Sequence, residues 1–255
     1  MDNLNIHRKV LLEIACFNEQ SAINAMKGGA DRIELCHDYA SGGLSPDETL
    51  LARLKSLVKI PIYVMIRPRP GNFCYDNVSF ETMKSTLTSL KNAGADGFVF
   101  GILNEGPSDT SDASWVDVAR NKELVQLAGG KPCTFHRAFD CIDEAHWGGA
   151  LTELMECGFT SILTSGPSGE QAIDCIDALA RLCDETVRPE IIIGGGVRFD
   201  NVGILWQRTH GRVFHSSALG LSSEIVEANE VRKLRESLRQ APKGDIQGQN
   251  FVGEI

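Results

Sequence analysis

Short apolar runs alternate along the chain with longer, more polar stretches that carry helix start and stop signals. A short apolar run bounded by turn residues is typical of a buried strand, and the longer stretches are typical of helices. Strands are predicted at residues 11–16, 31–36, 61–66, 97–100, 133–135, 161–164, 190–193 and 212–214. Helices are predicted at residues 19–27, 45–58, 79–92, 114–127, 143–157, 169–186, 201–209 and 228–239. The second helix has the clearest start, because Ser45 can cap it, Pro46 suits its first turn and Glu48 completes a capping box.

The strict alternation of strand and helix predicts a parallel sheet. A glycine that ends a helix shortly before a strand recurs at positions 29, 94, 158 and 211, as expected of repeated units. Eight such units and a length of 255 residues match a single α/β domain with the (β/α)8 TIM-barrel fold. We therefore expect a barrel over residues 1–240 and a C-terminal tail at 241–255. An open, doubly wound sheet is the alternative.

The side chains of a barrel strand point alternately to the surrounding helices and to the barrel interior. In the second strand, Ile33 and Leu35 require the apolar helix side, which places Glu34 inside. The same reasoning places the following residues inside: Glu13, Ala15, Arg32, Cys36, Tyr63, Met65, Arg67, Thr134 and His136. It places Cys16 on the helix side. Because buried charges must be paired or bind a ligand, we expect Glu34 and Arg67 to form an ion pair between neighbouring strands.

Charge and composition narrow the classes of partner. The formal net charge of −9 disfavours a nonspecific binder of nucleic acid or of anionic membranes. The chain has no apolar run of 18 or more residues, which a membrane span requires, and no apolar segment of a signal peptide follows the first charged residues. Eight cysteines are scattered without a CxxC pair, so we expect reduced thiols and no closed zinc site. These features predict a cytoplasmic protein.

Polar residues gather where the predicted strands end, on the face that carries the active site in barrel enzymes. The candidates for general acid or base chemistry are Glu34, His136 and Asp140. Asp140 is expected to orient either His136 or Arg137. Arginine side chains suit carboxylate or phosphate groups, and the candidates for binding such an anion are Arg67, Arg69 and Arg137. The alternative is a network of salt bridges that only fills the barrel.

A second group of anion-binding candidates lies in the loops after the seventh and eighth strands. These are Gly195 and Gly196, within a run of three glycines, and Ser216 and Ser217, after which we expect a short helix. Many barrels hold phosphate with these two loops and a helix N-terminus. The alternative is that the glycines only allow tight turns and the serines only cap a helix. The chain has no Walker loop, dinucleotide fingerprint or nucleophile elbow, so no organic cofactor is implied.

Several of these motifs together resemble the CutC family, usually called copper homeostasis proteins. They are GGADRIELC (28–36), VMIRPRPGNF (64–73), GADGFVFG (94–101), TFHRAFD (134–140), ILTSG (162–166), IGGGV (193–197) and FHSSA (214–218). The resemblance implies a (β/α)8 barrel in the cytoplasm and a small homo-oligomer, such as a dimer or tetramer. It also implies a role in handling Cu(I).

The resemblance associates copper with two cysteines that end the first two strands. The second corresponds to Cys36. The first falls on Ala15, and the only thiol nearby is Cys16. The alternation turns Cys16 toward the helices, although a bulge at the end of the strand would turn it inward.

Three hypotheses of function follow. The first is a Cu(I)-binding protein with Cys36 as the main ligand, Cys16 as a secondary one and Met65 nearby, because Cu(I) prefers sulfur donors. The second is an enzyme of unknown reaction that acts on a small anionic molecule at the barrel mouth. The third is a noncatalytic scaffold or regulator, which the many ionisable groups at the mouth disfavour.

Overall fold

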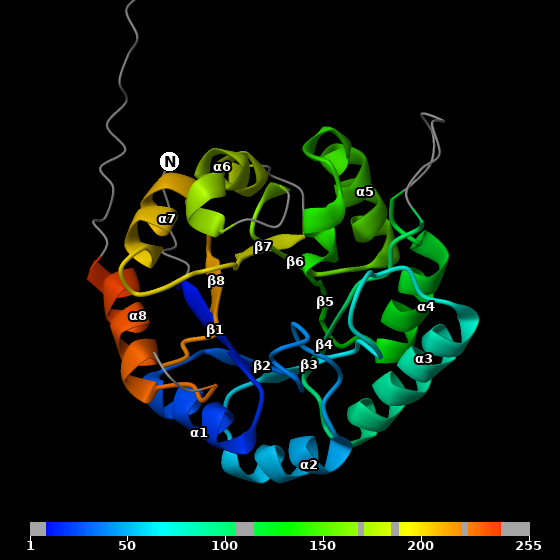
Figure 1. Ribbon diagram of the computed structural model, residues 1–255, viewed down its shortest axis with the longest axis horizontal. Coiled ribbons are helices and arrows are strands. Elements are labelled where there is room, and N and C mark those ends of the chain that lie inside the picture. The colour runs from blue at the N-terminus through cyan, green and yellow to red at the C-terminus, as the bar shows by residue number, and fades with distance from the viewer. Residues whose placement is uncertain (1–8, 106–114, 168–170, 185–188, 221–223, 241–255) are drawn as a thin grey trace, which may run out of the picture.

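The chain folds into a closed barrel of parallel strands, which confirms the predicted TIM barrel (Figure 1). The computed structural model describes residues 9–105, 115–167, 171–184, 189–220 and 224–240. Its strands are β1 (Leu11–Cys16), β2 (Arg32–Leu35), β3 (Ile62–Met65), β4 (Gly97–Phe100), β5 (Cys133–Phe135), β6 (Ser161–Thr164), β7 (Glu190–Ile193) and β8 (Val213–Ser216). Each strand pairs with the next, and β8 pairs with β1 to close the sheet. The predicted strands match these bounds closely, except that β8 continues to Ser216.

The helices form a ring around the strands (Figure 1). They are α1 (Glu19–Gly28), α2 (Glu48–Leu57), α3 (Asn77–Asn92), α4 (Val118–Ala128), α5 (Trp147–Cys157), α6 (Ile176–Asp184), α7 (Val202–Thr209) and α8 (Ala228–Gln240). In the described parts of the chain, short 3-10 helices occupy Arg137–Cys141, Glu144–His146 and Ala172–Cys175. Residue 114, the ends of the predicted sixth helix and the tail at 241–255 lie outside the described residues.

The start of α2 corrects the predicted cap. The Asp47 carboxylate accepts a hydrogen bond from the Thr49 N–H at 2.7 Å, so Asp47 caps the helix in place of Ser45. The Ser45 hydroxyl instead accepts from the Arg67 N–H at 2.8 Å and donates to the Arg67 carbonyl oxygen at 3.1 Å. Ser45 therefore fastens the loop after β2 to the end of β3, where the polar residues of the mouth begin.

The predicted alternation of side chains divides the buried residues into separate groups. Between strands and helices lies one large apolar core, which includes Leu12, Ile14, Cys16, Ile33, Leu35, Ile62 and Val64. Inside the barrel lie two small apolar clusters, one of Cys36, Tyr63, Met65 and Val99 and the other of Leu163, Ile192 and Val213. The interior is therefore apolar only in part, and the remaining positions are occupied by polar side chains. No helix among the described residues is long and apolar enough to cross a membrane.

Candidate functional site at the barrel mouth

A pocket of about 320 Å³ opens where the strands end. The predicted site residues that line it are Glu34, Cys36, Arg67, His136, Arg137, Gly195, Gly196, Ser216 and Ser217. They come from the ends of β2, β3, β5, β7 and β8 and from the loops that follow. The fold thus brings together most of the residues proposed from the sequence.

Arg69 is not among the residues that line this pocket. Its guanidinium donates to the carbonyl oxygen of Cys74 at 2.5 Å and to the side-chain oxygen of Asn72 at 3.0 Å, so it stabilises the loop after β3.

Asp140 is buried beside the pocket and orients Arg137, one of the two predicted alternatives. It accepts hydrogen bonds from Arg137 Nε at 2.7 Å, from the Thr164 hydroxyl at 2.5 Å and from the Ser165 N–H at 3.1 Å. Its carboxylate is thereby tied to β6 and holds a half-exposed arginine at the rim.

The predicted ion pair between Glu34 and Arg67 is wrong. Arg67 donates from Nη1 to the carbonyl oxygens of Ser41 at 3.0 Å and Gly43 at 3.1 Å, and from Nη2 to that of Gly71 at 3.1 Å. No ion pair joins it to Glu34 within 4.0 Å. Backbone carbonyls of two loops occupy both terminal nitrogens, whereas Arg67 Nε is buried and has no hydrogen-bond partner in the part of the chain that the structure describes.

His136 lies beside Arg67, and the Phe73 ring contacts both of them (4.7 Å between the ring centroids of Phe73 and His136, 5.0 Å from its centroid to the Arg67 guanidinium). His136 Nδ1 accepts a hydrogen bond from the Ala138 N–H at 3.2 Å, so the neutral ring carries its proton on Nε2. Burial and the charge of Arg67 lower the pKa of His136 to about 3, which keeps the ring neutral. His136 Nε2 is buried, and none of the described residues forms a hydrogen bond with it.

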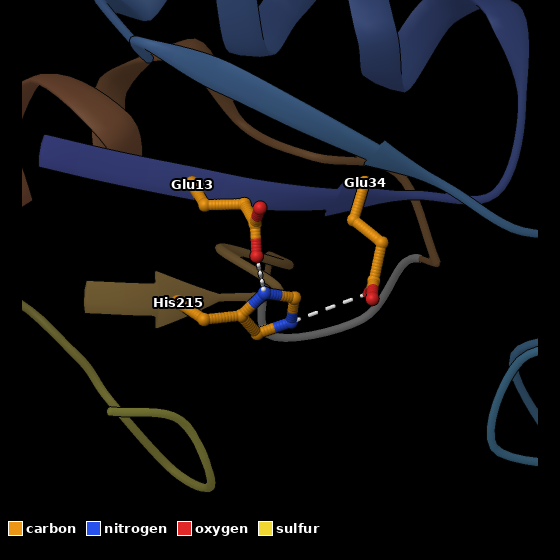
Figure 2. Close-up of side chains that lie close together, drawn as sticks. All are labelled: Glu13, Glu34 and His215. Carbon is orange, nitrogen blue, oxygen red and sulfur yellow. Dashed lines mark hydrogen bonds and ion pairs between the residues drawn. The ribbon is translucent and has the colours of Figure 1, made fainter. Parts of the chain in front are cut away.

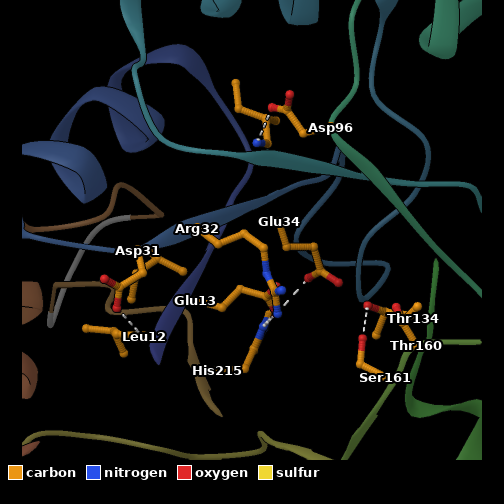
Figure 3. Close-up of polar contacts among 12 residues, drawn as sticks. Leu12, Glu13, Asp31, Arg32, Glu34, Asp96, Thr134, Thr160, Ser161 and His215 are labelled. Atoms are coloured by element: carbon orange, nitrogen blue, oxygen red, sulfur yellow. Dashed lines mark hydrogen bonds and ion pairs between the residues drawn. The ribbon is translucent and has the colours of Figure 1, made fainter. Parts of the chain in front are cut away.

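Within the barrel, Glu13 links Arg32 to His215 (Figure 3). Arg32 Nε donates to one carboxylate oxygen of Glu13 at 2.5 Å, and His215 Nδ1 lies 2.7 Å from the other. Burial alone would raise the pKa of Glu13, but Arg32 and His215 outweigh it and bring the pKa to about 2. Glu13 is therefore a charged residue whose two oxygens are both occupied.

Glu34 faces the other nitrogen of the same imidazole (Figure 2). His215 Nε2 lies 3.7 Å from Glu34 Oε2, and Cys36 Sγ lies 3.7 Å from the same oxygen. Burial raises the pKa of Glu34, and burial together with the Glu34 charge raises that of the Cys36 thiol. Burial lowers the pKa of His215, but the two glutamates outweigh it and raise the pKa. Glu34 Oε1 is buried and has no hydrogen-bond partner within the described ranges.

The two predicted copper ligands lie on different sides of the sheet. Cys36 lines the pocket, and Gly43 lies against both its sulfur and the methyl group of Met65. Cys16 packs in the apolar core on the helix side, where its thiol donates to the Ile14 carbonyl oxygen at 3.6 Å. Ala15 is the β1 residue that lines the pocket. The alternation thus continues through the end of β1, and the two thiols do not both face the mouth.

The loops after β7 and β8 line the pocket as predicted, but no helix starts at Ser217. Gly195 and Gly196 adopt positive φ angles of 89° and 72°. The Ser216 hydroxyl donates to the Val197 carbonyl oxygen at 2.6 Å and so joins the two loops. Ala218 takes a left-handed conformation (φ 43°) and the next residue pairs with Val226, which replaces the predicted helix.

The pocket is also lined by His215 and Arg198, whose side chains can carry positive charge and which were not among the candidate site residues. The signal for His215 was the alternation itself. Val213 faces the barrel interior, so the residue two positions later does too, once β8 is extended beyond Phe214. The sequence contains no comparable signal for Arg198. This residue lies in the loop after β7, where the alternation of a strand no longer applies, and the path of the loop brings it to the pocket.

Comparisons with known proteins agree with this geometry. A model of the CutC family matches residues 10–220. A CutC family protein of Proteus mirabilis is 39% identical over 192 residues, which cover 75% of this chain and 72% of the relative. The human copper homeostasis protein cutC homolog is 36% identical over 209 residues, or 82% of this chain and 73% of the relative. The crystal structure of a CutC protein from Streptococcus agalactiae matches with a TM-score of 0.74 and 30% identity, and covers 82% of this chain and 98% of that one.

Proposed function

From the premise that this chain belongs to the CutC family, as its match over residues 10–220 shows, we propose that it is a barrel enzyme whose pocket binds a small molecule with a carboxylate or phosphate group. One observation carries this proposal. Two neighbouring residues of the pocket wall, Arg67 and His136, each have a buried N–H donor that has no hydrogen-bond partner among the described residues. A buried donor that lacks an acceptor costs about 1–3 kcal/mol, and a bound anion offsets that cost.

The same wall is built to hold these donors in place before a ligand arrives. Three backbone carbonyls fix the Arg67 guanidinium, and the Ala138 N–H fixes the His136 ring. Because His136 is neutral, its Nε2–H can donate to an oxygen without bringing a second charge next to Arg67. Fixed donors of this kind bind and polarise an oxygen of a ligand with little loss of side-chain entropy.

The rim supplies further positive charge. Arg137, oriented by Asp140, and Arg198 both line the pocket, as does the backbone of Gly195 and Gly196. Glycine allows an anion to approach the backbone closely. Glu34, which also lines the pocket, is the candidate for proton transfer to or from the bound molecule.

Calorimetric titration with inorganic phosphate and with glycerol 3-phosphate tests this proposal. His136→Asn keeps an acceptor for the Ala138 N–H but removes the Nε2 donor, so we expect about 10-fold weaker binding or more. Arg69→Gln is the matched control, because Arg69 is two residues from Arg67 and does not line the pocket; its affinity should stay within about twofold of wild type. Equal affinity of wild type and His136→Asn, or no binding of either probe to the wild type, would contradict the proposal.

A second candidate function is the binding of Cu(I) as cargo. The observation that favours it is the proximity of Cys36 and Met65, two sulfur donors of the kind that Cu(I) prefers, in one cluster beside the pocket. Cys16 packs on the helix side, so we propose a copper site that does not use it. Cu(I) would therefore be held by Cys36 and Met65.

Titration of the reduced protein with Cu(I) against a competing chelator tests the copper hypothesis. We expect Cys36→Ser to weaken binding at least 10-fold, because it removes the thiolate ligand. Cys16→Ser is the matched control and should leave the affinity unchanged. If Cys36→Ser binds Cu(I) as tightly as wild type, the assignment fails.

The resemblance to the family also leads us to propose a cytoplasmic protein that forms a small homo-oligomer, a dimer or tetramer. The scattered cysteines without a CxxC pair agree with a reducing compartment. Light scattering of the purified protein would give the oligomer size, and a monomeric mass would contradict this part of the proposal.

A further inference from the structure

We propose that Glu34, His215 and Cys36 form a binding site for one divalent cation of the zinc class, with Glu13 as the residue that positions His215. The three donors are a carboxylate oxygen, an imidazole nitrogen and a thiol sulfur, the three kinds of atom that bind zinc in proteins. They come from the ends of β2 and β8, and all three residues line the pocket.

Two distances between the donor atoms, both measured from Glu34 Oε2, are close to those of a tetrahedral site. In such a site, with the bond lengths usual for zinc, a nitrogen and an oxygen ligand lie about 3.4 Å apart and a sulfur and an oxygen ligand about 3.6 Å apart. His215 Nε2 and Cys36 Sγ each lie 3.7 Å from Glu34 Oε2. The distance between His215 Nε2 and Glu34 Oε2 is longer than a direct hydrogen bond between nitrogen and oxygen. The Cys36 thiol donates a weak hydrogen bond to Glu34 Oε2, and a bound ion would replace the thiol proton.

Glu13 gives His215 the orientation that a metal ligand requires. Its carboxylate lies 2.7 Å from His215 Nδ1, which fixes the proton on that nitrogen and turns Nε2 toward Glu34 (Figure 2). Most histidines that bind a metal donate their other N–H to a carboxylate or carbonyl in this way. Arg32 neutralises Glu13, so Glu13 is engaged from two sides and is held in place.

Glu34 provides the second, independent observation. Only 4% of its surface is exposed, and its Oε1 has no hydrogen-bond partner among the described residues. The ion-pair partner found for it within those residues is His215, and no lysine or arginine there lies within 4.0 Å of it. A buried carboxylate needs a positive partner, which a cation at Oε2 supplies. A water molecule bound to the cation would donate a hydrogen bond to Oε1.

Three protein ligands leave the fourth position of a tetrahedral site open, as in catalytic zinc sites. This position would face the pocket that the three ligands line. The donor atoms of this site are not those of the proposed anion site, which are Arg67 Nε and His136 Nε2, so the cation and the anion do not use the same donors. The inference therefore stands apart from the proposed anion site, although a ligand held there would be within reach of the cation.

Titration with Co²⁺ tests the inference, because a thiolate bound to Co²⁺ gives a charge-transfer absorption that oxygen and nitrogen ligands do not give. The full-length reduced protein is first freed of metal with a chelator and then titrated. We expect one equivalent of Co²⁺ to produce the thiolate band, Zn²⁺ to displace it, and Cys36→Ser to abolish it. Glu34→Gln and His215→Asn should each weaken binding at least 10-fold, and Glu13→Gln about 10- to 100-fold through its effect on His215.

Two variants separate this site from the Cu(I) hypothesis. Met65→Leu should weaken Cu(I) binding and leave the Co²⁺ band unchanged, whereas His215→Asn should do the reverse. Cys16→Ser is the control for loss of a buried thiol and should keep the band. Far-UV circular dichroism shows which variants are folded. If a variant of Glu13, Glu34 or His215 does not fold, the Co²⁺ band of Cys36→Ser alone still tests the inference. Absence of the thiolate band in the wild type, or its persistence in Cys36→Ser, would overturn the inference.

Discussion

The buried ring of His136 leads to a prediction about stability in acid. Burial and Arg67 lower its pKa from 6.5 to about 3. The unfolded chain therefore binds a proton at this residue more readily than the folded chain does. The contribution of neutral His136 to stability is fully present above pH 6.5 and is lost as the pH falls toward 3.

The size of the effect follows from the shift. For each pH unit below 6.5, the free energy of unfolding falls by about 1.4 kcal/mol, until the pH reaches the pKa of His136 in the folded state. Between pH 7 and pH 5 the loss from His136 is about 2 kcal/mol. This figure hardly depends on the folded-state pKa, because at pH 5 the buried ring is still neutral in the folded protein.

Urea denaturation at pH 7 and at pH 5 measures the effect, with wild type compared with His136→Asn. Asparagine does not titrate, so the variant should lose about 2 kcal/mol less free energy of unfolding than wild type between the two pH values. Other acid-sensitive groups contribute equally to the pH dependence of both proteins, so their contributions cancel in this comparison. The exposed His146, changed to asparagine, is the surface control and should keep the wild-type loss. If wild type and His136→Asn lose the same free energy, the ring is solvated or already charged, and the reasoning is refuted.

Three further predictions concern the rest of the site. Glu13→Gln should lower the free energy of unfolding by about 3–5 kcal/mol in urea denaturation, because it leaves Arg32 buried without its counter-charge; a loss below about 1 kcal/mol would mean that the pair is solvated. Gly101→Ala places a Cβ 2.8 Å from His136 Nδ1, so it should cost about 1–3 kcal/mol and weaken phosphate binding in calorimetry; unchanged binding would place the donor elsewhere. Arg137→Gln should weaken phosphate binding more than Arg69→Gln, and equal effects would contradict the assignment of Arg137 to the rim.

The barrel and the inward side chains could be predicted because the alternation of a strand is local. Ile33 and Leu35 must meet the helices, and this alone sends Glu34 inside, as observed. The same rule placed Cys16 on the helix side, as found. The error at β8 has a simple cause: His215 and Ser216 are polar, so the strand was expected to end before them, although they continue its pairing with β1.

The partners of the charged residues inside the barrel could not be predicted. The alternation of a strand indicates which side of the sheet a side chain faces, but not which residue it contacts there. The loops that follow β2 and β3 fold back over the mouth, and their carbonyl oxygens occupy the Arg67 guanidinium. Glu34 therefore pairs with His215, which lies on β8 and is far away in the sequence. The cap of α2 is a similar case, because tertiary contact with Arg67 draws Ser45 away and Asp47 takes its place.

A crystal structure of the protein soaked with glycerol 3-phosphate tests most directly whether the mouth pocket binds a small acidic molecule. The account predicts a ligand inside the pocket, with one of its anionic oxygens within about 3 Å of His136 Nε2 and of Arg67 Nε. A ligand found only on the outer surface, or bound in the pocket with neither donor in contact, would contradict it.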